Sequence, residues 1–289
     1  MQITAKLVND LRARTNVGMM ECKKALVKTE GDYDAAVKLL RELGAAVSAK
    51  RAEKSAKEGL VYAKLCSCGS KIAIVEVNCE TDFVANSADS KAFVDKVADA
   101  ALDGEADLEG KLAEDKKALI AKVGEKVEIR RGDKLELQGT GVLQSYIHMG
   151  GKAGTIVEVG VGKEETLAAP EFQQLVKDLT LQITSAEPRW LDRTQVPQDV
   201  IDQEMEINAK KLEQEQAEKG GKPKPPEILK KIAMGQLGKF FADVCLVDQA
   251  FVKNGPGEKA TVAQIVAGVA KKLGDEIVVR RFVRYSLGA

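Results

Sequence analysis

The N-terminal part of the chain alternates between helical hydrophobic spacing and helix-breaking positions. Leu7 and Leu11 lie four residues apart, as on one face of a helix, and the run TNVG at 15–18 interrupts that pattern. Helical spacing resumes over residues 19–28 and again over about 32–44, after a turn that contains glycine. The pattern therefore predicts three short helices.

These helices and a linker make up the first predicted domain, residues 1–54. The stretch AKRAEKSAK at 49–57 is charged and rich in small residues, a composition typical of linkers. Three short helices bury only a small core, which is marginally stable alone. We therefore interpret the domain as a docking module and not as a catalytic one.

Beyond the linker the hydrophobic period changes from helical to strand-like. The residues SCGS at 67–70 separate two strand-like runs and have the composition of a hairpin turn. Hairpins and helices then follow without the regular strand–helix–strand alternation of a parallel sheet, which predicts an α+β fold. The elements expected here are strands at 60–66 and 71–79, helices at about 87–102 and 112–123, and strands at 127–132, 135–149 and 155–161.

The C-terminal part of the chain is mainly helical by the same measure. Apolar residues recur every three or four positions on both sides of the break GGKPKPP, which predicts two antiparallel helices in a projecting hairpin. Each half of the chain beyond the linker combines a hairpin with a helix, which hints at a degenerate internal duplication, although residue-level similarity between the halves is weak. The elements expected are a helix through Phe172, Val176, Leu179 and Ile183, hairpin helices at about 201–212 and 229–240, a helix near 261–273 and a strand at 276–287.

Composition and charge narrow the classes of function. Lys plus Arg (44) balances Asp plus Glu (44), so no net charge draws the chain to nucleic acid or an anionic membrane, although a local basic patch stays open. Aromatic residues make up only 4% of the chain, which argues against a surface that stacks bases. No apolar run approaches the roughly 20 residues of a membrane span, and the first residues lack the apolar segment of a secretory signal. We expect neither a nucleic-acid nor a membrane partner.

The cysteines favour a reducing compartment. They are odd in number and scattered, in a chain too large to need disulfide staples, so we expect a cytoplasmic location; a mature organellar protein without its targeting segment stays open. Cys66 and Cys68 are separated by one residue, and no second Cys or His pair completes a zinc-like site. We therefore expect thiols that face solvent or are half-buried, and no metal.

An enzyme of the usual hydrolytic kinds is hard to build from this sequence. His148 is the single histidine, and no G-x-S-x-G motif surrounds a serine. None of the Gly-Lys pairs is followed by Ser or Thr, as a phosphate-binding P-loop requires, and no G-x-G-x-x-G fingerprint occurs. We expect no enzymatic activity, no cofactor and no direct nucleotide binding.

The segment ETDFVAN at 80–86 connects a predicted strand to a predicted helix and leaves two interpretations open. Phe83 can act as a lid on the local core, the commoner role of a lone phenylalanine in a connection. Alternatively, Asp82 and Phe83 form a protruding tip with an aromatic wedge beside an acid. The sequence pattern does not decide between them.

Several segments resemble a known family. The chain contains NVGMMECKKAL at 16–26 and EVNCETDFVA at 76–85, which look like the two signature segments of elongation factor Ts. YIHMGGKAGTIVEV at 146–159 and KFFADVCLVDQAFV at 239–252 are similar to the family as well. The resemblance implies a small N-terminal domain like ubiquitin-associated domains, a core of two related α+β subdomains with antiparallel sheets, an inserted antiparallel helical hairpin and a C-terminal module.

The hydrophobic pattern and the resemblance together divide the chain into five parts. Their predicted bounds are 1–54 for the N-terminal domain and linker, 55–140 for the first core subdomain, 141–187 for the first part of the second, 188–237 for the helical hairpin, and 238–289 for the second part with the C-terminal module.

The resemblance also implies a partner and its contact residues. Family members bind the GTPase elongation factor Tu and speed the release of its GDP. The family's Asp-Phe tip, which disturbs the magnesium and phosphate site of the GTPase, matches Asp82 and Phe83 between Thr81 and Val84, and His148 matches a histidine whose loop reaches the same region. The segment that docks on the nucleotide-binding domain matches Leu11, Arg12, Met19 and Met20.

Other interpretations stay open at this point. The two methionines can instead pack the three-helix core, and for Met20 the two roles are equally balanced. The chain can be a non-catalytic adaptor or chaperone that uses its N-terminal helices, or a cysteine-dependent enzyme that uses His148. The helical hairpin can extend the partner contact or mediate a homodimer or a 2:2 complex.

Overall fold

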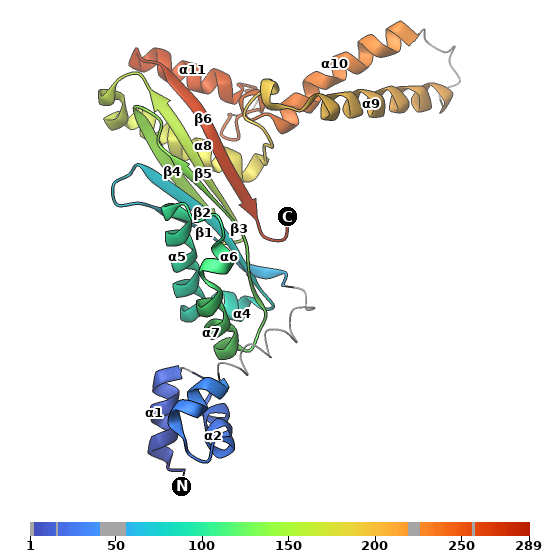
Figure 1. Cartoon of the computed structure of the whole chain (residues 1–289). Helices are drawn as coiled ribbons and strands as arrows, with labels where there is room; N and C mark the ends of the chain where they lie inside the picture. Colours follow the sequence, from blue (N-terminus) through green and yellow to red (C-terminus); the bar gives the residue numbers. More distant parts are fainter. Residues whose placement is uncertain (1–2, 16, 41–55, 219–225, 256–257) are drawn as a thin grey trace. The chain divides into compact units, whose positions relative to one another are not determined.

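The computed structural model describes residues 3–15, 17–40, 56–218, 226–255 and 258–289 (Figure 1). Two compact units make up the chain. The first comprises Met1–Glu136, Ile147–Gly154 and Tyr285–Ala289, and the second comprises Leu137–Tyr146 and Thr155–Arg284. The five predicted domains are continuous segments, whereas each of these units combines separate segments of the chain. The predicted bounds therefore stay a prediction.

Three short helices begin the chain, as the hydrophobic spacing predicts: α1 (Ala5–Thr15), α2 (Met19–Lys28) and a helix over residues 33–40. Asp32 starts the third helix because its Oδ1 accepts a hydrogen bond from the Ala35 amide at 2.9 Å. Leu11, Cys22 and Leu26 are fully buried between the helices. The predicted end of the third helix at Gly44, most of the predicted linker and Asn16 lie outside the described residues.

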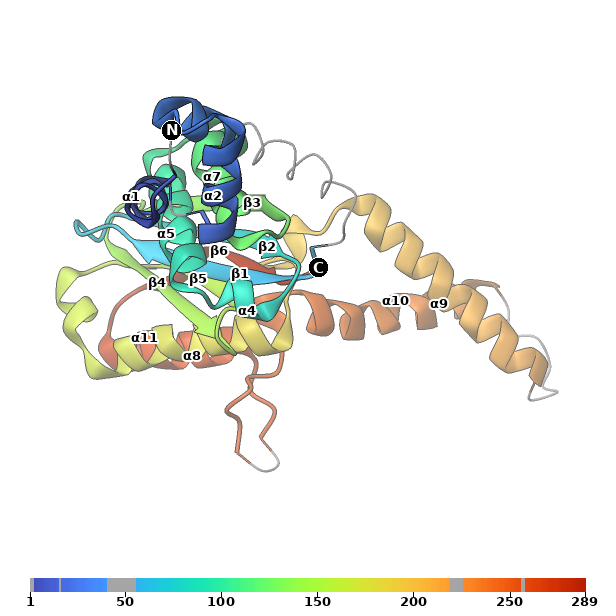
Figure 2. The same ribbon diagram turned by 90° about the horizontal axis from the view of Figure 1, so that it is seen from below.

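The first unit contains an antiparallel sheet of order β1-β2-β3. The predicted hairpin is confirmed, because β1 pairs with β2 from Glu58 opposite Cys79 to Leu65 opposite Ile72. Helices lie on one face of this sheet (Figures 1 and 2). The elements are β1 (Glu58–Leu65), β2 (Lys71–Cys79), α4 (Asp82–Ala85), α5 (Ala88–Asp103), α6 (Leu108–Lys111), α7 (Ala113–Val123) and β3 (Val127–Glu136).

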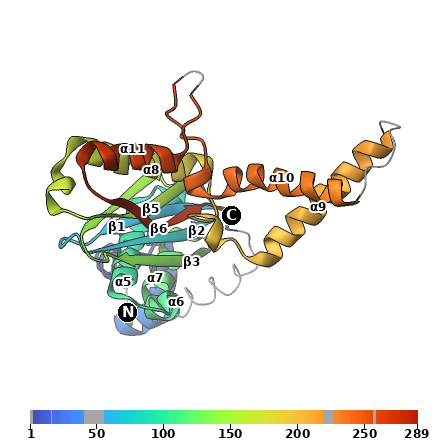
Figure 3. The ribbon, with the colours of Figure 1, turned by 90° about the horizontal axis from the view of Figure 1, so that it is seen from above.

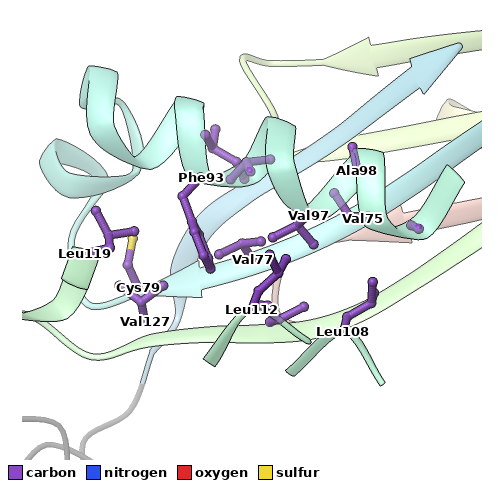
Figure 4. Close-up of a cluster of buried hydrophobic side chains, with 14 of the residues drawn as sticks. Val75, Val77, Cys79, Phe93, Val97, Ala98, Leu108, Leu112, Leu119 and Val127 are labelled. Atoms are coloured by element: carbon purple, nitrogen blue, oxygen red, sulfur yellow. The ribbon is translucent and has the colours of Figure 1, made fainter. Parts of the chain in front are cut away.

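Hydrophobic side chains join these helices to the sheet. Phe93 and Val97 of α5 point toward Val75 and Val77 of β2 (Figure 4). Ser87 caps the start of α5 by accepting the Ser90 amide, and the helix ends at Gly104 in a left-handed conformation (φ 88°) that glycine adopts without strain. Alternate residues of β2 therefore face a closed core.

The second unit contains most of a sheet of order β4-β5-β6. Phe172, Leu179 and Ile183 of α8 are buried in its core, as their spacing predicts. Helices α8 and α11 contact each other and run side by side (Figures 2 and 3). The elements are β4 (Gly141–His148), β5 (Ala153–Val161), α8 (Pro170–Ala186), α11 (Val262–Leu273) and β6 (Ile277–Ser286), with 3₁₀ helices at Glu164–Ala168, Arg193–Gln195 and Leu246–Asp248.

A long helical hairpin interrupts the second unit. Helices α9 (Gln198–Glu218) and α10 (Pro226–Val244) contact each other, which confirms the predicted pair (Figure 3). Their connection at 219–225, with most of the predicted break GGKPKPP, lies outside the described residues. In the parts of the chain that the structure describes, no helix combines the length and the apolar character needed to cross a membrane.

The two sheets share a buried glutamate that is paired with arginines, which supports the suggested internal duplication. The sequence IVEV occurs at 74–77 on β2 and again at 156–159 on β5, each the middle strand of its sheet. The glutamate of each copy, Glu76 or Glu158, is fully buried. An Arg-Arg pair on the third strand of the same sheet contacts it, at 130–131 for Glu76 and at 280–281 for Glu158.

Glu158 is held ionised by its surroundings. Arg281 donates to Oε2 at 2.6 Å, while Arg280 and the Gln138 amide donate to Oε1 at 3.1 and 2.7 Å. Burial alone would raise the pKa of Glu158, but these hydrogen bonds outweigh burial and hold the pKa below its ordinary value. The carboxylate thus ties β5 to β6 and to the residues before β4.

We expect Glu158→Gln to lower the free energy of unfolding of this unit by roughly 3 kcal/mol at neutral pH, because two arginines lose their buried counter-charge. Urea unfolding followed by Trp190 fluorescence measures the change. Since the pKa of Glu158 is lower in the folded state, its stabilisation is complete above the unfolded pKa of about 4.3 and is lost as pH falls through the folded pKa. The difference from wild type should therefore shrink in acid.

The exposed Glu165 provides a control in the same unit. Glu165→Gln should change the free energy of unfolding by less than about 0.5 kcal/mol. Equal unfolding curves for wild type and Glu158→Gln at neutral pH would contradict a stabilising role for the buried carboxylate.

Candidate functional site

A single helical turn, α4, follows the middle strand of the first sheet directly. Thr81 begins it: its Oγ1 accepts a hydrogen bond from the Val84 amide at 3.4 Å, and its carbonyl accepts one from the Ala85 amide at 3.2 Å. Asn86 ends it, because its backbone and side-chain nitrogens both donate to the Asp82 carbonyl. The turn therefore has hydrogen-bonded backbone at both ends.

Glu125, in the connection between α7 and β3, fixes the start of this turn from outside. Its carboxylate accepts hydrogen bonds from the Thr81 amide at 3.0 Å and from Thr81 Oγ1 at 2.7 Å. One residue away on each side, Glu80 accepts a hydrogen bond from the Lys126 amide at 2.8 Å. Three hydrogen bonds therefore join residues 80–81 to residues 125–126, and we call this set the clasp. Each has a carboxylate as acceptor, which makes it strong.

The turn directs its side chains to two sides. Ala85 is buried, and Val84 is half-buried and packs on the core of the first unit. Asp82 is exposed, and 85% of the surface of Phe83 is open to solvent. Of the two interpretations left open by the sequence, the lid on the core is therefore wrong, and Phe83 protrudes beside Asp82.

Cys79 anchors the end of β2 just before the turn. Its Sγ donates a hydrogen bond to the Thr81 carbonyl at 3.1 Å, and its side chain is buried. Burial raises the pKa of this thiol to about 11, so it stays protonated at neutral pH. Cys79 therefore supports the turn structurally and is a poor nucleophile.

His148 is the last residue of β4, directly before the turn at 149–152 that connects β4 to β5. His148 is exposed, and 73% of the surface of Met149 is exposed as well. Gly151 has a φ of 100°, and a Cβ there would lie 2.7 Å from a methyl carbon of Leu60, so only glycine fits. The Gly151 carbonyl accepts the Val61 amide at 2.8 Å, which seats this turn on β1.

Both turns adjoin the beginning of β1. Glu58 is paired with Cys79 in the β1–β2 register, and α4 contacts β1. Glu58 also forms an ion pair with Lys152, the last residue of the turn after His148. The structure thus brings the predicted Asp82–Phe83 tip and the predicted His148 loop, far apart in sequence, to the same end of one hairpin.

The four predicted docking residues separate into two groups. Met19 and Met20 are 47% and 63% exposed, and Arg12 is exposed too, so the methionines do not pack the three-helix core. Together with Val27 (57% exposed) Met20 forms an apolar stripe on α2. Leu11, in contrast, is fully buried, so its side chain stabilises the helices that present the stripe, and its place in the docking segment stays a prediction.

Glu125 is a residue of the site that the sequence analysis did not identify. A lone acid after a helix carries no signal until its partner Thr81 is known.

Cys66 and Cys68 form a disulfide in this structure, which corrects the expectation of two thiols. Among the described residues, no group of three or more His, Cys, Asp or Glu side chains is placed to hold a metal ion.

Comparison with known proteins bears on the whole chain. A family model described as "Elongation factor TS" matches residues 80–289. The elongation factor Ts of Symbiobacterium thermophilum is 42% identical over 99% of this chain and 92% of its own length. Those of Bdellovibrio bacteriovorus and Chloroherpeton thalassium are each 40% identical, over 100% and 99% of this chain and 94% and 99% of their own lengths. The chain therefore belongs to the elongation factor Ts family of translation elongation factors.

Proposed function

We propose that the chain is a guanine-nucleotide exchange factor, which binds elongation factor Tu in its GDP form and promotes release of the GDP. The observation that carries this proposal is the exposure of Phe83 on a turn that Glu125 clasps. The activity requires no bond making, so the chain acts as a binding protein and not as an enzyme. A cytoplasmic location, where translation proceeds, goes with this proposal.

An exposed phenylalanine on a fixed turn is suited to insertion into a partner. Burying a Phe side chain is favourable by about 1.5–3 kcal/mol, and Phe83 leaves nearly all of that gain unused in the free chain. Because Thr81 and Glu125 already order the turn, little conformational entropy is lost when the side chain inserts. Phe83 therefore supports a wedge mechanism better than a mobile side chain would.

The groups near this wedge are suited to disturbing the contacts that hold GDP in a GTPase. Bound GDP in a GTPase is retained by backbone N–H groups, a lysine and Mg²⁺ around its phosphates. The exposed carboxylate of Asp82, in α4, and the imidazole of His148, at the end of β4, lie at the same end of the β1–β2 hairpin. Inserted together, they would disturb the residues that orient the magnesium waters while Phe83 displaces a packed side chain.

Thermodynamic linkage sets the direction of exchange. If the factor weakens GDP binding, GDP weakens binding of the factor by the same ratio. Incoming nucleotide therefore helps to expel the factor, and the concentrations of GDP and GTP decide which nucleotide is loaded. The factor accelerates equilibration because it stabilises the nucleotide-free GTPase.

The N-terminal helices supply affinity in this proposal. Met20 and Val27 on α2 form the exposed apolar stripe, and three lysines (Lys23, Lys24 and Lys28) border it. Such a stripe gains free energy when a partner covers it. The helical hairpin α9–α10 is a second candidate surface, either for elongation factor Tu or for a homodimer within a 2:2 complex.

The same apolar stripe is compatible with one other function. A non-catalytic adaptor or chaperone would use Met20 and Val27 to bind a different chain, and exchange would then be irrelevant. The cysteine-dependent enzyme has less support, because Cys79 and Cys245 are buried and burial raises the pKa of each to about 11. Nucleotide release distinguishes the adaptor from the exchange factor directly.

The first test is stopped-flow release of a fluorescent GDP analogue from elongation factor Tu. The chain should accelerate release in a saturable manner, and Phe83→Ala should reduce the maximal rate by about 10- to 100-fold, because the wedge is lost. Leu65→Ala removes another exposed apolar side chain of the same unit and should have no effect. No acceleration by the folded wild-type chain would reject the exchange function in favour of the adaptor.

The clasp at Thr81 can be tested apart from binding. Glu125→Ala should weaken protection of the Thr81 and Val84 amides, because a charged acceptor worth about 1.5–3 kcal/mol is removed. Hydrogen–deuterium exchange of residues 80–86 measures this. Glu128→Ala, which removes the ion pair between the exposed Glu128 and the half-buried Lys126, is the control. Unchanged exchange in Glu125→Ala would mean that the clasp does not order the turn.

Docking should be separable from nucleotide release. Met20→Ser should raise the concentration of chain needed for half-maximal acceleration by roughly 3- to 10-fold, since apolar contact area is lost, and should leave the maximal rate unchanged. The exposed Val252 of the second unit offers the control Val252→Ser. A lower maximal rate without a change in apparent affinity would remove Met20 from docking.

A further inference from the structure

The turn between β1 and β2 holds a cysteine pair that the proposed function does not use. Cys66 follows the last residue of β1, and Cys68 comes two residues later, with their Cα atoms 5.3 Å apart. The backbone enforces this proximity: the Cys66 carbonyl accepts the Gly69 amide, and the Cys66 amide donates to the Lys71 carbonyl, both at 2.9 Å. Such a Cα separation is in the range that disulfides require.

Access separates this pair from the other cysteines of the chain. Cys68 is exposed and Cys66 is half-buried. Cys22, Cys79 and Cys245 are buried, with exposures of 0%, 4% and 0%. A reagent dissolved in water therefore reaches the pair in the folded protein and does not reach the other three thiols.

The two sulfur atoms have different surroundings. The Lys71 amide donates a hydrogen bond to Cys66 Sγ at 3.3 Å, a contact that favours a thiolate at that atom. Cys68 Sγ lies 3.0 Å from Ser70 Oγ and faces solvent. An incoming thiolate thus meets Cys68 first, and the sulfur that leaves is the one stabilised by a backbone N–H.

We propose that Cys66 and Cys68 form a reversible redox site, which exchanges with low-molecular-weight thiols and disulfides. In reduction, an external thiolate attacks Cys68 Sγ, the Cys66–Cys68 bond breaks, and the electron pair leaves on Cys66 Sγ. A second thiolate then attacks the external sulfur of this mixed disulfide, which releases the external disulfide and the Cys68 thiolate. The net change consumes two thiols and yields one external disulfide and the protein dithiol.

Oxidation runs through the same intermediate in the opposite direction. The Cys68 thiolate attacks an external disulfide and releases one thiolate, and the Cys66 thiolate then attacks Cys68 Sγ and releases the second. Cys66 is therefore the resolving residue, which keeps the mixed disulfide at Cys68 short-lived. An exposed disulfide that closes so small a loop belongs with the labile and regulatory kind, not with structural staples.

This site lies at the opposite end of the β1–β2 hairpin from the Phe83 turn. Leu65 and Ile72 are paired beside the cysteines, whereas Glu58 and Cys79 are paired beside α4. Seven residues of extended strand separate the two ends by about 23 Å. The redox proposal is thus independent of the exchange function, and its test needs no GTPase.

The test equilibrates the full chain with glutathione and its disulfide at a series of ratios, followed by acid quenching, alkylation and mass spectrometry. The peptide that contains Cys66 and Cys68 should pass from the disulfide to the doubly alkylated form as the buffer becomes more reducing. Cys22, Cys79 and Cys245 should form neither a disulfide nor a glutathione adduct in the folded chain. A pair that stays oxidised, or stays reduced, at every ratio would overturn the proposal.

Single substitutions test the assigned roles. Cys66→Ser removes the resolving thiol and should accumulate a mixed disulfide with glutathione at Cys68, at more than about ten times the level in wild type. Cys68→Ser leaves only the less accessible Cys66, which should form the adduct more slowly. Cys68 is exposed and Cys66 is half-buried, so circular dichroism verifies the fold of both variants. Equal adduct levels in Cys66→Ser and wild type would reject resolution by Cys66.

Discussion

A buried carboxylate on the middle strand of each sheet is the constraint on which the rest of the fold depends. An ionised side chain in the interior must find opposite charge and hydrogen-bond donors, or its desolvation costs several kcal/mol. Glu76 obtains them from Arg131 on β3 at 2.7 Å, and Glu158 from Arg280 and Arg281 on β6. A one-residue slip of β2 against β3 would separate the charges of the first pair, so the ion pair helps to fix the strand register.

That register sets the position of the functional turn. With β2 fixed against β1 and β3, Cys79 comes opposite both Glu58 and Val127, and Thr81 reaches the carboxylate of Glu125. The exposed aromatic ring therefore owes its direction to contacts of the sheet and the α7–β3 connection, not to any preference of its own four-residue helix.

The sequence predicted what depends on local spacing. The three N-terminal helices, the β1–β2 hairpin, α8 and the helical pair α9–α10 follow from hydrophobic periodicity and turn composition, which act over a few neighbouring residues. The direction of Phe83 did not follow, because it depends on Glu125, a partner far along the chain. The pairing of Cys66 with Cys68 likewise depends on backbone geometry that spacing does not specify.

The order of strands also has a consequence for synthesis on the ribosome. The first sheet is complete once β3 has emerged at Glu136, whereas the second waits for β6, which begins only at Ile277, after the whole helical hairpin. Closing so long an excursion is slow, since its entropy is lost before any contact is gained. Strands β4 and β5 therefore leave the exit tunnel before β6 is available to pair with them. During this interval the edge of β5 is unpaired, and an unpaired strand edge promotes aggregation.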